Sequence, residues 1–219
     1  MNPIIFSAPM IKQILAGNKT QTRRLVKPQP GVCHGLNLAN PCGSTEYDIN
    51  ADGVIRCSKC HKQYEYSPEG KDIIKILQSP YKPGDVLYVR ETWAYIKETH
   101  PGCYHYRASA TEADEQWFRE NGWKWRSSLY MPRAAARIFL KVKNVRVERL
   151  QDIGIEDAQA EGFDAVFCYA YLARKKICNS CIGCYLKIWN SLYAKKPEYQ
   201  WDKNPYVWVV EFERTEAGE

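Results

Sequence analysis

Residues 137–150 read RIFLKVKNVRVERL and hold the longest strand pattern in the chain. Ile138, Leu140 and Val142 share one parity, and Val145 and Val147 share the other. Successive side chains of a strand point to opposite faces of its sheet, so the change of parity predicts a bulge or sharp bend near Asn144. A coiled barrel strand needs such a bend.

Shorter patterns on both sides of this strand complete the predicted fold. Strands are predicted over residues 86–91 and 206–214, and short helices over residues 9–16, 111–121, 155–161 and 184–194. The second helix has a predicted capping box, with Thr111 as its N-cap and Asp114 three residues later. The last strand is apolar enough to be central in its sheet. Strands of mixed spacing joined by short helices predict an α+β fold around a small, mostly antiparallel β-barrel.

Composition and charge narrow the class of protein. The chain has 219 residues and 45% apolar residues, which suits a single domain, residues 1–219, that carries insertions. No apolar run approaches the ~18 residues of a membrane helix, and no basic leader precedes an apolar run at the N-terminus. We therefore expect a cytoplasmic protein without a membrane partner. The net charge of +6 permits contact with phosphates.

Two segments are predicted to be cysteine-bearing insertions, residues 31–80 and residues 164–184. The first has four Cys, two His and little periodic apolar pattern, so bound Zn²⁺ would supply the stability that its small core lacks. The candidate zinc ligands are Cys33, Cys42, Cys57, Cys60, Cys168, Cys178, Cys181 and Cys184. The cysteines of residues 31–80 and those of residues 164–184 form two separate metal sites or bind one shared ion. Alternatives are His34 or His61 as ligands, an iron–sulfur cluster, and thiols without a metal.

The basic segment Lys19–Arg24 has two interpretations. It is a solvated loop beside a helix end, where basic residues favour the helix dipole. Alternatively, it faces phosphate and contains a hydroxyl nucleophile, Thr22, with Lys19 as the base that takes its proton. Residues three apart face opposite sides of a straight strand, so the second interpretation requires a turn between Lys19 and Thr22.

Glu161 is the second candidate for chemistry. It ends a predicted helix, where a carboxylate opposes the helix dipole. It is therefore either exposed and tolerated or held in place for proton transfer, and composition alone favours exposure.

Seven Trp residues add large aromatic surfaces. Most are expected in the core. Trp93, Trp123 and Trp125 lie near a strand end or a loop, where an indole ring can also stack on a nucleobase.

Five segments together resemble the ASCH family, a PUA-like β-barrel domain linked to RNA, and in particular its larger branch from phages and prophages. The segments are ILAGNKTQTRR (14–24), GDVLYVRETW (84–93), MPR (131–133), AEGF (160–163) and WVVEF (208–212). The resemblance covers most of the chain outside the two insertions.

The resemblance implies an amidohydrolase that removes the acetyl group from N4-acetylcytidine or a similar nucleoside. Lys19 and Thr22 match the family's catalytic lysine and threonine, and Glu161 is the best match to its glutamate. Four arginines are candidates for holding RNA phosphate or ribose: Arg23, Arg24, Arg90 and Arg133. The alternative functions are a non-catalytic RNA-binding module and, third, a ribonuclease.

Overall fold

The computed structural model describes most of the chain in two compact units. The described residues are 1–30, 46–49, 53–58, 61, 63, 65–66, 75–76, 78–97, 103–163 and 180–216. Unit 1 comprises residues 1–20, 84–141 and 212–219, and unit 2 comprises residues 21–83 and 142–211. Most of the predicted insertion 31–80, and residues 164–179 of the second, lie outside the described residues.

Unit 1 contains strands β1 (Asn2–Ile5) and β7 (Val86–Arg90), which pair in parallel. Strand β10 (Phe139–Arg149) begins here and pairs antiparallel with β7. The other elements are α1 (Ala8–Leu15), the hairpin of β8 (Trp93–Tyr95) and β9 (Tyr104–Tyr106), α2 (Glu112–Glu120), and the 3-10 turns η1 (Arg107–Ser109), η2 (Ser128–Tyr130) and η3 (Arg133–Ala135).

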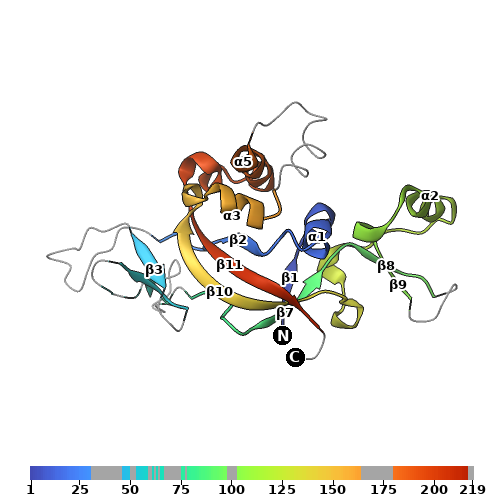
Figure 1. The fold of residues 1–219 in the computed structure, drawn as a ribbon, viewed down its shortest axis with the longest axis horizontal. Coiled ribbons are helices and arrows are strands. Elements are labelled where there is room, and N and C mark those ends of the chain that lie inside the picture. The colour runs from blue at the N-terminus through green and yellow to red at the C-terminus, as the bar shows by residue number, and fades with distance from the viewer. Residues whose placement is uncertain are drawn as a thin grey trace. The chain divides into compact units, whose positions relative to one another are not determined.

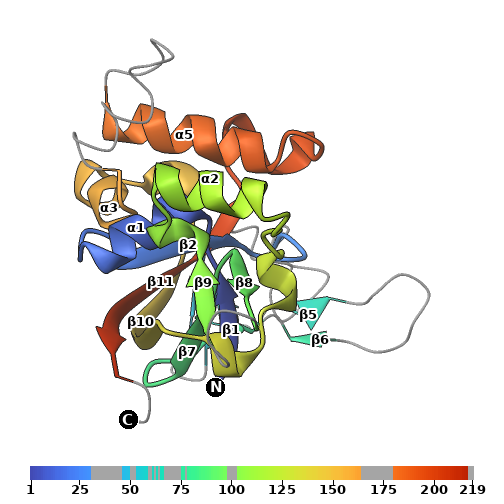
Figure 2. The ribbon, with the colours of Figure 1, turned by 90° about the vertical axis from the view of Figure 1, so that its right-hand side faces the viewer.

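Unit 2 contains strand β2 (Gln21–Leu25), which pairs antiparallel with strand β11 (Tyr206–Thr215). Helices α3 (Ile155–Ala160) and α5 (Cys181–Leu192) pack against each other, as Figures 1 and 2 show. The remaining elements are β3 (Tyr47–Ile49), β4 (Ile55–Cys57), β5 (Glu65–Tyr66), β6 (Lys75–Ile76), η4 (Leu150–Asp152), η7 (Pro197–Tyr199) and η8 (Trp201–Lys203).

The hydrogen-bonded order of the largest sheet is β1-β7-β10-β11-β2. The predicted α+β class is confirmed, with mostly antiparallel pairing and a central β11. The sheet is open within the described part of the chain, where β1 and β2 form its edges and no closed barrel is present.

Burial along β10 confirms the change of parity that the sequence shows near Asn144. Val142 is buried, Lys143 and Asn144 are both exposed, and Val145 is buried again. Two successive exposed residues break the alternation of the strand, so the apolar side chains on both sides of the break still reach the core.

The helix predictions hold within a few residues. The expected capping box of α2 is present, because the Thr111 hydroxyl accepts from the Asp114 N–H and the Asp114 carboxylate accepts from the Thr111 N–H. Helix α5 begins at Cys181 rather than at the predicted residue 184. The Ser180 side chain caps this helix by accepting from the Gly183 N–H, so the first turn forms despite its glycine.

Of the seven Trp residues, Trp93, Trp189 and Trp208 are buried as expected, whereas Trp117 is 38% exposed. None of the helices in the described ranges is both long and apolar enough to cross a membrane.

Candidate active site

The segment after α1 turns sharply before β2 begins. Gly17 has φ of +80°, and the backbone N–H groups of Asn18 and Lys19 both donate to the Gln13 carbonyl. A residue without Cβ reaches this left-handed conformation at little cost. This turn lies before Lys19 and not between Lys19 and Thr22, where the nucleophile interpretation requires one. Thr20 already continues the pairing of β2, because its carbonyl accepts from the Phe212 N–H at 2.8 Å.

Lys19, in unit 1, is not on a solvated loop. Only 4% of its surface is exposed, and its ammonium nitrogen lies 5.6 Å from the centroid of the Phe6 ring. The expectation of a solvated basic loop is wrong for this residue, because the turn directs the side chain against an aromatic core residue that is 5% exposed.

Thr22, in unit 2, is also buried, at 2% exposure. It lies on β2 opposite Val210 of β11, a strand that is almost entirely buried from its first residue to Val210. Pairing with this central strand takes Thr22 out of solvent.

Glu161 lies at the C-terminal end of α3 and is 4% exposed, so the exposed placement favoured by composition is wrong. Its Oε1 accepts a hydrogen bond from the backbone N–H of Arg23 at 2.5 Å. That N–H belongs to the peptide group that joins Thr22 to Arg23. Because β2 is an edge strand, its outward N–H has no strand partner, and the carboxylate takes that place. The structure therefore brings Glu161 to the backbone of Thr22.

The side chain of Arg23 is fully buried within a carboxylate cluster. Its Nη2 donates to Glu148 at 3.2 Å and to Asp157 at 3.0 Å, and Nη1 lies 3.8 Å from Oε1 of Glu161. Its Nε and Nη1 have no hydrogen-bond partner among the described residues. With 0% side-chain exposure, Arg23 has the surroundings of a structural cation rather than of a phosphate ligand.

Arg146 provides the second cation of this cluster. It donates to Glu148 and Glu211, and its Nη2 donates to Asp157 at 3.2 Å. The set of Arg23, Arg146, Glu148, Asp157, Glu161 and Glu211 is called the charge cluster below. Four carboxylates and two guanidinium groups give the charge cluster a formal charge of −2.

Within the charge cluster, Asp157 is the carboxylate whose pKa departs clearly from its ordinary value. Burial raises its pKa, but hydrogen bonding from the Gln21 side chain and the positive charge of Arg23 outweigh burial and lower the pKa overall. The Gln21 amide donates to the Asp157 carboxylate at 2.9 Å and to its carbonyl at 3.0 Å. This carboxylate therefore stays ionised and fixes the start of β2 to α3.

Tyr185 is a site residue that the sequence reasoning missed, since it was assigned only to the apolar face of a helix. It is 5% exposed, and its hydroxyl has no hydrogen-bond partner among the described residues. Burial raises its pKa well above the usual value, the charge of Glu161 adds to the rise, and Arg23 and Arg24 oppose it. Tyr185 is therefore a neutral phenol with an unused donor near Glu161. No signal in the sequence separates such a tyrosine from an ordinary core tyrosine.

The other three candidate arginines lie in different surroundings. Arg24 is half-buried on β2, and its charge partly opposes the burial that raises the pKa values of Tyr81 and Tyr193. In unit 1, Arg90 contacts Tyr88, whose hydroxyl accepts from Nη2 at 3.0 Å, and Arg133 is exposed. Arg24 is thus the candidate phosphate ligand that shares unit 2 with Thr22.

Three of the eight predicted zinc ligands are described. Cys57 is buried on β4, and Cys181 and Cys184 lie in the first turn of α5 at a spacing that places both on one side of the helix. The other five, Cys33, Cys42, Cys60, Cys168 and Cys178, lie outside the described residues. Within the described part of the chain, no three His, Cys, Asp or Glu side chains gather as a metal site. Zinc binding stays a prediction.

No family model, curated protein or solved structure matches this chain.

Proposed function

We propose that this protein is an ASCH-type amidohydrolase that removes an acyl group from the exocyclic amine of a cytidine-type nucleoside, free or within RNA. The observation that carries the proposal is the 2.5 Å hydrogen bond between the Glu161 carboxylate and the peptide N–H that follows Thr22. It brings Glu161 to the residue that follows Thr22, and both Thr22 and Glu161 are buried. A hydroxyl nucleophile needs an activating group within reach, and this bond places a carboxylate at the peptide group after Thr22.

In the first proposed step, the Thr22 hydroxyl attacks the carbonyl carbon of the substrate amide. Lys19 takes the hydroxyl proton as the general base. The bond between the carbonyl carbon and the nucleobase nitrogen then breaks. That nitrogen receives the proton, and the acyl group remains as an ester on Thr22.

In the second proposed step, water attacks the ester carbonyl and gives a proton to Lys19. The bond between the carbonyl carbon and the Thr22 oxygen breaks, Lys19 returns its proton to that oxygen, and the carboxylic acid leaves. Glu161 orients the backbone that carries Thr22 in both steps, through the hydrogen bond from the Arg23 N–H.

Tyr185 is the proposed donor to the developing oxyanion. The chemistry of this hydroxyl supports the role. It is neutral, buried and without a hydrogen-bond partner among the described residues, so it can donate to a developing negative charge without breaking another hydrogen bond. Arg23 is a positioning residue in this scheme, since it contacts Glu161 and two further carboxylates but is fully enclosed.

The proposal includes a PUA-like fold, supported by the mostly antiparallel sheet and by the change of parity in β10. It also includes structural Zn²⁺ held by cysteines of the two insertions. The buried Cys57 and the Cys181–Cys184 pair are the described residues that support this part.

The test is an absorbance assay for conversion of N4-acetylcytidine to cytidine. Wild-type protein should turn over this substrate, and Thr22→Val, which keeps the shape but loses the hydroxyl, should not. Thr22→Ser should retain part of the activity. Thr20→Ala is the matched control with full activity, because Thr20 is exposed and contributes a backbone carbonyl to Phe212. Turnover by Thr22→Val at the wild-type rate would overturn the assignment of the nucleophile.

A non-catalytic RNA-binding module is the second candidate. It is favoured by the mixture of basic and aromatic side chains in unit 2, where Arg24 lies near Tyr81 and Tyr193, and the Lys27 amine lies 5.7 Å from the Tyr199 ring. RNA binding that weakens steeply with salt, without any acyl product, would support this candidate instead.

A further inference from the structure

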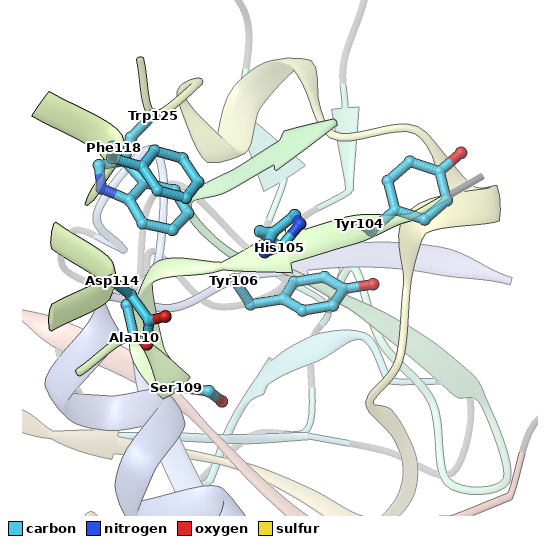
Figure 3. A pocket seen from close by; sticks show the side chains of 8 residues that line it. All are labelled: Tyr104, His105, Tyr106, Ser109, Ala110, Asp114, Phe118 and Trp125. Atoms are coloured by element: carbon cyan, nitrogen blue, oxygen red, sulfur yellow. The ribbon is translucent and has the colours of Figure 1, made fainter. Parts of the chain in front are cut away.

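Unit 1 contains a pocket of about 210 Å³ between the β8–β9 hairpin and α2, as Figure 3 shows. The pocket lies entirely within unit 1, whereas Thr22 and Glu161 belong to unit 2. It is smaller than the ~300–1,000 Å³ typical of sites for whole ligands, so a single ring system is the size of group that it admits.

The pocket wall is aromatic and rigid. Phe118 and Trp125 stack with centroids 4.1 Å apart and planes inclined by 9°, and the His105 ring meets Phe118 edge-on at 5.8 Å. The Trp125 N–H donates to Glu115 at 3.1 Å, which fixes the plane of the indole. Such a wall offers a preformed surface to another flat ring.

The polar side of the pocket is an acceptor. Oδ2 of Asp114 accepts from the backbone N–H and the hydroxyl of Thr111, both at 2.7 Å, and these bonds lower the pKa of Asp114. Oδ1 takes no hydrogen bond from the described residues. An ionised carboxylate accepts hydrogen bonds and cannot donate them, so it pairs with an amino group and repels a carbonyl oxygen.

We propose that this pocket binds a planar heteroaromatic ring that bears an amino group, the chemistry of a cytosine or adenine base. The ring lies against the aromatic wall, and its amino group donates to Oδ1 of Asp114. Carboxylates read the amino group of cytosine in this way in nucleic-acid complexes. The proposal stands apart from the proposed hydrolysis, because it concerns a different unit and needs no reaction.

The experiment is calorimetric titration with two pairs of nucleosides, cytidine against uridine and adenosine against inosine. Each pair replaces an amino group by a carbonyl. The amino-bearing member should bind about tenfold more tightly, as expected for one hydrogen bond to a charged acceptor. Equal affinities within both pairs would overturn the proposal.

Substitutions inside and outside the pocket show whether the nucleoside binds there. Asp114→Asn should remove the preference for the amino group, whereas Glu112→Gln, which removes a charge from the same helix turn outside the pocket, should keep it. Ser109→Trp fills the pocket from an exposed position and should abolish binding in a folded protein. Binding that survives both pocket variants, or that is lost in Thr22→Val instead, would contradict the assignment.

A short single-stranded RNA distinguishes the two sources of such a ring. If the natural ligand is a base within RNA, the oligonucleotide should bind more tightly than the nucleoside and remain sensitive to Asp114→Asn. If the oligonucleotide binds no more tightly than the nucleoside, a free nucleoside or nucleotide is the ligand.

Discussion

Nη2 of Arg23 donates to Oδ2 of Asp157 at 3.0 Å, although the two residues are 134 positions apart in the chain. The contact ties the edge strand β2 to the helix that ends at Glu161. The position of Glu161 beside the peptide group after Thr22 thus depends on the ion pair between Arg23 and Asp157.

Asp157→Asn should destabilise the protein by about 1–3 kcal/mol at neutral pH, because it leaves buried donors of Arg23 and Gln21 poorly satisfied. The folded-state pKa of Asp157 is lowered, so its contribution is complete above the ordinary aspartate pKa of about 3.9 and is lost as the pH falls through the lower folded value. Urea unfolding at neutral pH and below pH ~4 is the measurement. The difference in the free energy of unfolding between wild type and variant should be smaller at the acidic pH. Asp202→Asn, an exposed control, should unfold like wild type.

Arg23→Leu should cost about 3–5 kcal/mol, because it leaves the carboxylates around it buried without their cation. The measurement is the free energy of unfolding by urea. Arg119→Leu, on the exposed face of α2, is the matched control and should change stability little. A loss in Arg23→Leu no larger than in the control would show that the charge cluster is not structural.

Tyr185→Phe separates catalysis from stability. Removal of a buried hydroxyl without a partner should leave stability unchanged within about 1 kcal/mol or raise it slightly. If the hydroxyl serves the oxyanion, kcat for N4-acetylcytidine should fall about 10²-fold. Thermal unfolding checks the expected stability, and steady-state kinetics on the same preparation check the expected fall in kcat. An unchanged kcat would assign Tyr185 to packing alone.

Elemental analysis should find about one or two zinc ions per chain, as predicted for one or two four-thiolate sites. Cys57→Ser and Cys184→Ser should lower the zinc content, whereas Cys103→Ser, outside the predicted ligand set, should not. A chelator should lower the temperature of unfolding. Purified protein that is folded without zinc would reject the prediction.

The sequence predicts the elements well and the burial of the site poorly. The parity change in β10 and the capping box at Thr111 depend on neighbouring residues, so local patterns were sufficient for both. For Lys19 and Glu161, composition favours an exposed position over a catalytic one, because charged side chains usually lie in solvent. Their burial depends on Phe6 and on the Arg23 backbone respectively, and no local pattern encodes contacts with these residues. The charge cluster unites residues from four separate segments, so only the fold reveals it.

The bond between Glu161 and the outward N–H of Arg23 has a consequence for association between molecules. The unpaired backbone groups of an edge strand can pair with a strand from another chain. A buried carboxylate at this edge would repel the backbone carbonyl groups of that strand. The carboxylate that is proposed to position Thr22 therefore also protects the protein against association through β2.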